Sequence, residues 1–153
     1  TLPSLVERLK AAYGLVTSGK FPEAFQAFGG IVCATTLTVV ESRQQVGELK
    51  ELLNICREYL TAIRLELARK QTSEPKRQIE LAAYFTHCNL QPTHTMLAVK
   101  NAMGVAFKLK LLITASAFAR RLLELNPKPE FSTQARKVIQ LSEQNPGDAF
   151  AFE

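Results

Sequence analysis

Two histidines and a cysteine come nearest, by type and spacing, to a metal site in this chain: His87, Cys88 and His94. A structural zinc site needs four ligands, usually as two pairs with short spacing. Neighbouring residues on a helix point in different directions, and the sequence contains no second Cys/His pair. The sequence therefore predicts no metal and no other cofactor, and favours a histidine at a helix end beside a core cysteine.

Covalent catalysis by cysteine would require an exposed thiol with a lowered pKa. The three cysteines, Cys33, Cys56 and Cys88, are widely spaced, and each has apolar neighbours. We expect buried free thiols in a reducing compartment rather than a disulfide framework.

The carboxylates, glycines and basic residues form no recognisable catalytic motif either. Glu48 and Glu51 fall on the polar face of a predicted helix, and no Lys-Ser/Thr pair follows Gly29-Gly30 as a phosphate loop would require. The best basic patch lacks interleaved aromatic residues for base stacking; it comprises Lys108, Lys110, Arg120, Arg121 and Lys128. The sequence predicts a protein that is not an enzyme, with no nucleic acid and no small-molecule substrate as partner.

The elements that carry these residues are predicted to be helices. The 153 residues are 46% hydrophobic and 22% charged, as in ordinary globular chains, and are rich in helix formers. We predict an all-α fold with a single helical domain over residues 1–148. The tail at residues 149–153 is expected to lead into an absent C-terminal part, and the start at Thr1 rather than Met suggests a fragment. The uncharged run 25–40 contains two glycines and several threonines, so it is a poor membrane span.

A helical hairpin is predicted around Gly19. This glycine should leave the first helix in a left-handed conformation, Phe21 should fill the turn, and Ala24 should let the helices approach closely, with Phe28 on the same face. The spacing resembles that of tetratricopeptide helix pairs, and similar packing recurs near Ala115, far beyond their ~34-residue period. We therefore predict an irregular stack of helical hairpins with tetratricopeptide-like packing, of the α-solenoid type, which would present surfaces to other proteins.

A long core helix is predicted to begin after the capping box Ser42–Gln45. Its apolar residues follow a 3-4 spacing that favours core packing over self-dimerisation; they are Val46, Leu49, Leu53, Cys56, Leu60, Ile63 and Leu67. The other helices are expected over residues 4–18, 22–34, 76–88, 92–110, 113–125 and 129–145.

One extended connector, Thr35–Val40, is rich in β-branched residues. Alternation places Leu37 and Val39 on one face and Thr36, Thr38 and Val40 on the other. Two interpretations remain open: Leu37 and Val39 fold back onto the core, which we favour, or a partner grips the connector.

Three longer strings carry a family resemblance: residues 55–59 (ICREY), 80–92 (ELAAYFTHCNLQP) and 117–130 (AFARRLLELNPKPE), with 107–110 (FKLK) before the last. In this order they resemble the C-terminal region of the coatomer alpha subunit, over essentially the whole chain. The resemblance implies a structural role in the coat of vesicles that travel from the Golgi to the endoplasmic reticulum. It implies docking of the coatomer epsilon subunit, itself a tetratricopeptide-type protein. It also implies a cytoplasmic location, peripheral on Golgi membranes and transport vesicles, with only indirect membrane contact through the coat.

The family continues past the position of Phe150 into a cysteine-bearing, strand-rich end. A polar turn is expected after residues 107–110, where this chain has Leu111-Leu112-Ile113. This apolar turn either packs against another segment or marks a partner surface. The predicted partner-binding residues are Thr36, Leu37, Thr38, Val39, Val40, Leu111 and Leu112. The alternatives are a helical-repeat adaptor for another protein and a basic RNA-binding helical module.

Overall fold

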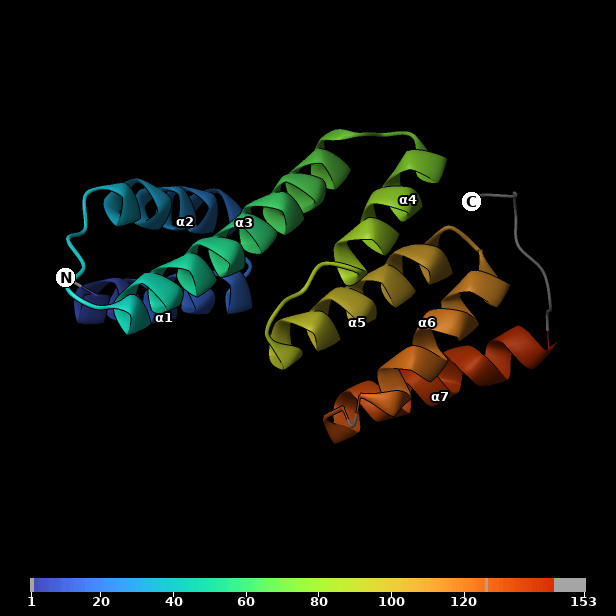
Figure 1. Ribbon diagram of the computed structural model, residues 1–153. Coiled ribbons are helices and arrows are strands. Elements are labelled where there is room, and N and C mark those ends of the chain that lie inside the picture. The colour runs from blue at the N-terminus through green and yellow to red at the C-terminus, as the bar shows by residue number, and fades with distance from the viewer. Residues whose placement is uncertain (1, 126, 145–153) are drawn as a thin grey trace. The chain divides into compact units, whose positions relative to one another are not determined.

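The computed structural model describes residues 2–125 and 127–144, and over these residues it has seven helices and no β-strand (Figure 1). They are α1 (Leu2–Thr17), α2 (Phe21–Thr36), α3 (Arg43–Gln71), α4 (Pro75–Thr86), α5 (Pro92–Lys108), α6 (Leu112–Glu124) and α7 (Pro129–Gln144). The all-α prediction is confirmed, while the predicted tail at 149–153 lies outside the described residues. Over the described part of the chain, no helix combines the length and apolar character needed to cross a membrane.

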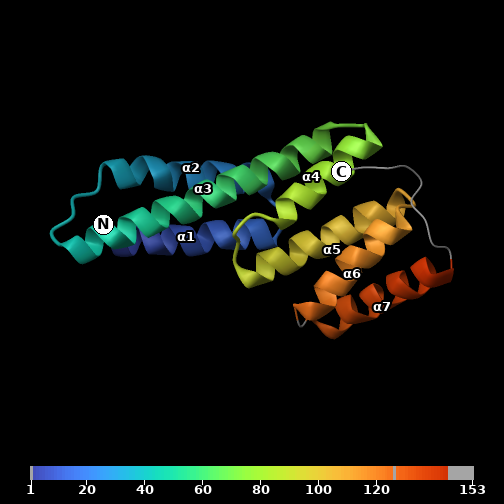
Figure 2. The ribbon, with the colours of Figure 1, turned by 45° about the vertical axis from the view of Figure 1, so that its right-hand side comes forward.

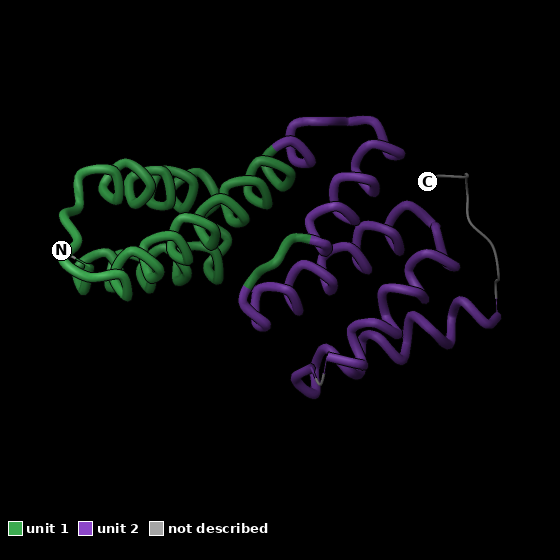
Figure 3. The backbone as a smooth tube through the Cα atoms, in the orientation of Figure 1, with its two compact units in different colours: residues 1–67, 88–90 green, residues 68–87, 91–153 purple. Residues whose placement is uncertain are grey.

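The chain divides into two compact units (Figure 3). The first comprises residues 1–67 and 88–90, and the second comprises residues 68–87 and 91–153. The single domain over residues 1–148 stays a prediction.

The first unit contains the predicted helical hairpin. Gly19 has a φ of 76°, in the left-handed region, and its amide donates to the Val16 carbonyl at 3.0 Å. The next amide, of Lys20, reaches back to the Leu15 carbonyl at 2.9 Å, which completes a Schellman motif. Across the turn, α2 buries Ala24 and Phe28 completely. The structure confirms the predicted hairpin. It could be predicted because the turn depends on a short-range pattern of glycine, small and aromatic residues.

In both ribbon views α3 lies alongside α1 and α2 (Figures 1 and 2). Aromatic rings from all three helices meet in the core: Tyr59 stacks on Phe28 with centroids 4.7 Å apart and lies 5.0 Å from Tyr13. These rings fix which face of α3 is deepest. The buried face of α3 is rotated about the helix axis from the predicted stripe. It consists of Leu52, Cys56, Tyr59, Ala62, Ile63 and Glu66.

Of the predicted stripe only Cys56 and Ile63 are buried. Val46 is 38% exposed, and the other four positions are half-buried: Leu49, Leu53, Leu60 and Leu67. Leu52, the neighbour of Leu53, takes the core position, with 5% of its surface exposed.

In the second unit each helix from α4 to α7 packs against the next one along the chain (Figures 1 and 2). This is the predicted stack of helical hairpins. Small side chains on α5, α6 and α7 allow close packing; Ala106, Ala115, Ala119 and Ala135 are completely buried. Phe107, near the end of α5, is 41% exposed.

Candidate interaction surface

The candidate surface lies where α2 joins α3, and we call residues 36–40, which include the last residue of α2, the arm. The helix α2 continues through Thr36, so the connector begins later than predicted, at Leu37. Backbone and side-chain bonds to the last turn of α2 hold its start: the Leu37 amide donates to the Ala34 carbonyl at 3.1 Å, and the Thr38 hydroxyl donates to the same carbonyl at 2.8 Å. The arm therefore leaves the helix in a defined direction.

The far end of the arm is held by the capping box that the sequence predicts. The Gln45 amide donates to the Ser42 hydroxyl oxygen at 3.2 Å, and the Gln45 side-chain oxygen accepts from the Glu41 amide at 2.8 Å. These bonds satisfy one amide in the first turn of α3 and one amide two residues before the helix begins. Both ends of the short connector are thus attached to helix termini.

The expectation that Leu37 and Val39 fold back onto the core is wrong. Leu37 is 84% exposed and Val39 is 87% exposed, while Thr38 and Val40 are half-buried. The alternation therefore holds only from Leu37 to Val40, where it points the apolar pair outward, whereas Thr36 is the exposed last residue of α2 and does not belong to it. Exposing the aliphatic side chains of Leu37 and Val39 to water is unfavourable, by roughly 25 cal/mol for each Å² of apolar surface.

Val39 lines two hollows of this surface. One has a volume of about 380 Å³ and is lined by Ser4, Leu5, Arg8, Ala34, Leu37, Thr38 and Val39. The other, of about 230 Å³, is lined by Leu2, Pro3, Val39, Val40, Glu41 and Gln45. The arm and the start of α1 therefore line two hollows that share the apolar side chain of Val39.

Arg8 is the residue of this surface that sequence analysis missed. Its guanidinium lies against Gly30 on α2: a Cβ built on Gly30 would be only 2.9 Å from Nη2 of Arg8. The glycine pair was considered only as a phosphate loop, whereas Gly30 leaves space for a side chain from the neighbouring helix. The position of Arg8 relative to Gly30 depends on the pairing of α1 with α2, which a sequence pattern does not specify.

The three residues of the apolar turn, Leu111-Leu112-Ile113, differ in burial within the second unit. Leu111 is completely buried in the core, and its amide donates to the Ala106 carbonyl at 2.9 Å. Lys110 just before it adopts a φ of 61°, which turns the chain inward. Leu112 is half-buried and Ile113 is 55% exposed. For Leu111, packing against another segment is therefore the interpretation that the structure supports.

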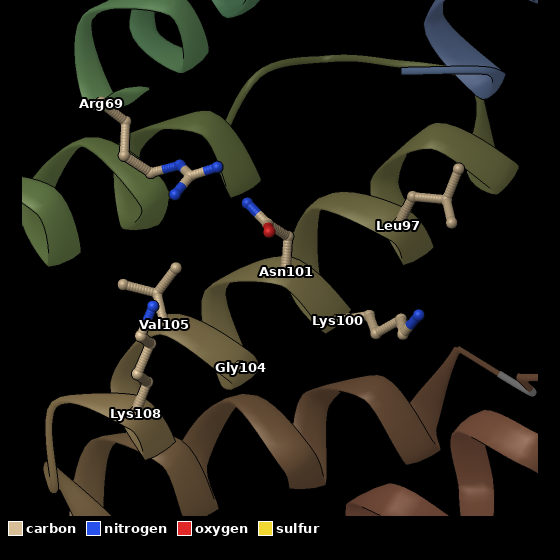
Figure 4. A pocket seen from close by; sticks show the side chains of 7 residues that line it. All are labelled: Arg69, Leu97, Lys100, Asn101, Gly104, Val105 and Lys108. Atoms are coloured by element: carbon tan, nitrogen blue, oxygen red, sulfur yellow. The ribbon is translucent and has the colours of Figure 1, made fainter. Parts of the chain in front are cut away.

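A separate groove of about 380 Å³ lies beside α5 in the second unit (Figure 4). It is lined by Arg69, Leu97, Lys100, Asn101, Gly104, Val105 and Lys108. Lys100 points away from the other labelled side chains, and its ammonium lies 4.5 Å from the centre of the Phe131 ring. The Arg69 guanidinium and the Asn101 amide point toward one another. Lys100 thus does not converge with Arg69 in this groove.

Within residues 2–125 and 127–144, the cysteine, histidine and acidic side chains do not gather into a metal site or an activated thiol. Over the described residues no three His, Cys, Asp or Glu side chains lie close enough together to hold a metal ion. Burial raises the pKa of the Cys56 thiol to about 11, and burial together with the charge of Glu58 raises the pKa of Cys88. A catalytic thiol needs the opposite shift. The expectation of buried thiols is wrong for Cys33, which is exposed on α2.

Comparison with known proteins decides the family. Over residues 1–153 the sequence matches the family described as the C-terminus of the coatomer (COPI) alpha subunit. This chain is a member of that coatomer family. The resemblance carried by residues 55–59, 80–92 and 117–130 is thereby confirmed.

Relatives in distant eukaryotes agree with this coatomer assignment. The chain is 47% identical over 153 residues to coatomer subunit alpha of Dictyostelium discoideum and 50% identical over 145 residues to coatomer subunit alpha-1 of Arabidopsis thaliana. Coatomer subunit alpha of Saccharomyces cerevisiae is 30% identical over 149 residues. These matches cover 95%, 94% and 96% of this chain but 12% of each relative. The chain therefore spans about one-eighth of the length of these relatives.

Proposed function

We propose that this segment of a COPI coat subunit is a non-catalytic scaffold that docks the coatomer epsilon subunit in Golgi-to-endoplasmic-reticulum transport. It acts in the cytoplasm, peripherally on Golgi membranes and transport vesicles, and meets the membrane only through the rest of the coat. The family match and the all-α fold support a structural role.

The observation that carries the proposal is the outward apolar pair on the arm, Leu37 at 84% exposure and Val39 at 87%. Exposed apolar segments that adjoin hollows are typical of surfaces that another protein covers. A tetratricopeptide-type partner has a concave helical surface, which suits a short extended segment. The Thr38 hydroxyl bonds to the Ala34 carbonyl at 2.8 Å and holds the start of the arm. The predicted contact residues of the arm, Thr36, Leu37, Thr38, Val39 and Val40, form one continuous segment.

The other predicted contact, at Leu111 and Leu112, offers fewer accessible side chains than the arm. Leu111 has no exposed side-chain surface, so a contact there would involve the half-buried Leu112. The arm is the principal surface of this proposal, and Leu112 is a secondary one.

The test is a calorimetric titration of the chain with purified epsilon subunit. Leu37→Asp together with Val39→Asp should reduce the affinity by about tenfold or more, because two charges replace apolar contact surface. Helical circular dichroism should stay unchanged, since both side chains are exposed in the free chain. Phe107→Asp, which charges a 41% exposed aromatic residue on α5, is the matched control and should bind normally.

Two results would contradict the proposal. Normal binding by the double variant would place the contact outside the arm, and absence of binding by the unmodified chain would exclude epsilon docking by this segment. A pull-down from cytosol then separates the alternatives, because an adaptor would capture another protein and an RNA-binding module would capture nuclease-sensitive material.

A further inference from the structure

The larger hollow beside the arm has a distinctive combination of chemistry. Among the described residues that line it, Arg8 has the only charged side chain, and Leu5, Ala34, Leu37 and Val39 supply apolar walls. An arginine next to apolar surface is a preferred feature of protein interfaces, because its planar guanidinium binds a carboxylate through two parallel hydrogen bonds.

Gly30 contributes to the position of this charge. Because it has no side chain, the Arg8 head can lie directly against α2, where a Cβ would come within 2.9 Å of Nη2. Gly29, the adjacent residue of the same helix, has no heavy atom within 4 Å of an added Cβ. The two neighbouring glycines therefore differ in one respect that matters here: one shapes the site of the guanidinium, and the other faces open space.

We propose that Arg8 recognises an Asp or Glu carboxylate of the chain that docks on the arm. This inference rests on the proposed docking function and adds the chemistry of the partner: an acidic side chain flanked by apolar residues. The apolar residues cover Leu37 and Val39, and the carboxylate enters the hollow beside them and pairs with the guanidinium. Charge complementarity at this point fixes the register of the partner along the arm.

The decisive comparison uses the two glycines. Gly30→Ala should weaken binding of purified epsilon subunit by about threefold to tenfold, because the methyl group displaces the end of a flexible side chain. Gly29→Ala should stay within about twofold of the unmodified chain. Both substitutions replace a glycine inside α2 with alanine and raise helix propensity equally, so their difference reports on Arg8.

A charge reversal gives the second comparison. Arg8→Glu should reduce affinity by about tenfold or more, since two carboxylates would then face one another. Lys10→Glu makes the same change in net charge on the same helix, at a side chain that bonds to Glu7 at 3.2 Å, and should have an effect under about threefold. Binding by Arg8→Gln should also lose most of the salt dependence that the unmodified chain shows between about 50 and 300 mM salt.

The outcomes separate this inference from the docking proposal. If the double arm variant fails to bind while Arg8→Glu and Gly30→Ala bind normally, the docking proposal holds and the role of Arg8 is refuted. If the double arm variant binds normally, or the unmodified chain does not bind, both are refuted. Self-association of the chain that Arg8→Glu abolishes would identify a second copy as the occupant and would overturn the inference.

Discussion

The guanidinium of Arg121 on α6 binds both oxygens of Thr86, the last residue of α4. Nη1 donates to the hydroxyl oxygen at 2.9 Å and Nη2 donates to the backbone carbonyl at 2.8 Å. The hydroxyl in turn donates to the Ala83 carbonyl at 2.6 Å, and Thr86 is 2% exposed. The charged group thereby satisfies a carbonyl at a helix C-terminus, where positive charge is favourable. Arg121 therefore connects two helices that are not neighbours along the chain.

Arg121→Ala should destabilise the protein by about 1.5–3 kcal/mol, the usual range for hydrogen bonds to a charged group when a buried partner is left unsatisfied. Arg120→Ala is the control, because Arg120 is exposed on the same helix, and its effect should stay within about 0.5 kcal/mol. Urea denaturation of both variants measures the difference. Equal stability of the two would mean that the bonds to Thr86 make no net contribution.

Leu52 and Leu53 should respond very differently to truncation. Leu52→Ala should cost about 2–5 kcal/mol, because Leu52 is 5% exposed in the core of the first unit and its removal leaves a cavity. Leu53→Ala should cost clearly less, since Leu53 is only half-buried. Thermal and urea denaturation of this pair tests which face of α3 is deepest. A larger loss at Leu53 would restore the stripe predicted from the sequence and contradict the structure.

Local sequence patterns predicted the helices and turns of this fold, but they did not predict which face of a helix packs against its neighbours. The hairpin at Gly19 and the capping box at Ser42 depend on residues a few positions apart, so the sequence contains the whole cause. The deep face of α3 depends on where Tyr13 and Phe28 bring their rings to Tyr59. Because α3 is apolar over a broad face, its sequence allows more than one orientation.

The connector lies close to its predicted position, although it begins at Leu37 rather than Thr35, but its exposure was not predicted. The β-branched composition of residues 35–40 indicated a connector, and alternation assigned Leu37 and Val39 to a common face. General preference for apolar burial then favoured folding back, yet both side chains are exposed. The Leu37 amide and the Thr38 hydroxyl both donate to the Ala34 carbonyl and so set the direction of the arm, and no hydrophobicity pattern contains that information.

The three cysteines should differ in reactivity toward a thiol reagent. At about pH 8, exposed Cys33 should react in the native protein, and Cys56 should react only after denaturation because it is buried and its pKa is raised. Cys33→Ser should remove the fast phase of a colorimetric thiol assay. A fast phase that survives this substitution would assign the reactive thiol to Cys56 or Cys88.

Stability should fall as the pH rises through the range in which Cys56 holds its proton only in the folded state. Its pKa rises from 9.0 to about 11 on folding, so the unfolded chain loses the proton first. The stabilising effect is complete below pH 9 and is lost as the pH approaches 11, at about 1.4 kcal/mol for each pH unit. Cys56→Ala lacks this contribution. The difference in unfolding free energy between the unmodified chain and this variant, measured from denaturation curves, should therefore shrink over the same pH range. A deficit that stays constant with pH would contradict the raised pKa.

Gly19 and Gly14 should give opposite results when replaced by alanine. Gly19 has a φ of 76°, and no heavy atom lies within 4 Å of an added Cβ, so the cost of Gly19→Ala is that of the left-handed backbone, about 1–2 kcal/mol. Gly14 lies inside α1 with equally open space, and Gly14→Ala should stabilise by about 0.5–1 kcal/mol through helix propensity. Urea midpoints of the two variants should therefore move in opposite directions from that of the unmodified chain. Since neither methyl group meets another atom, only backbone conformation can separate them, and a gain in stability for Gly19→Ala would show that the Schellman turn joining α1 to α2 is absent.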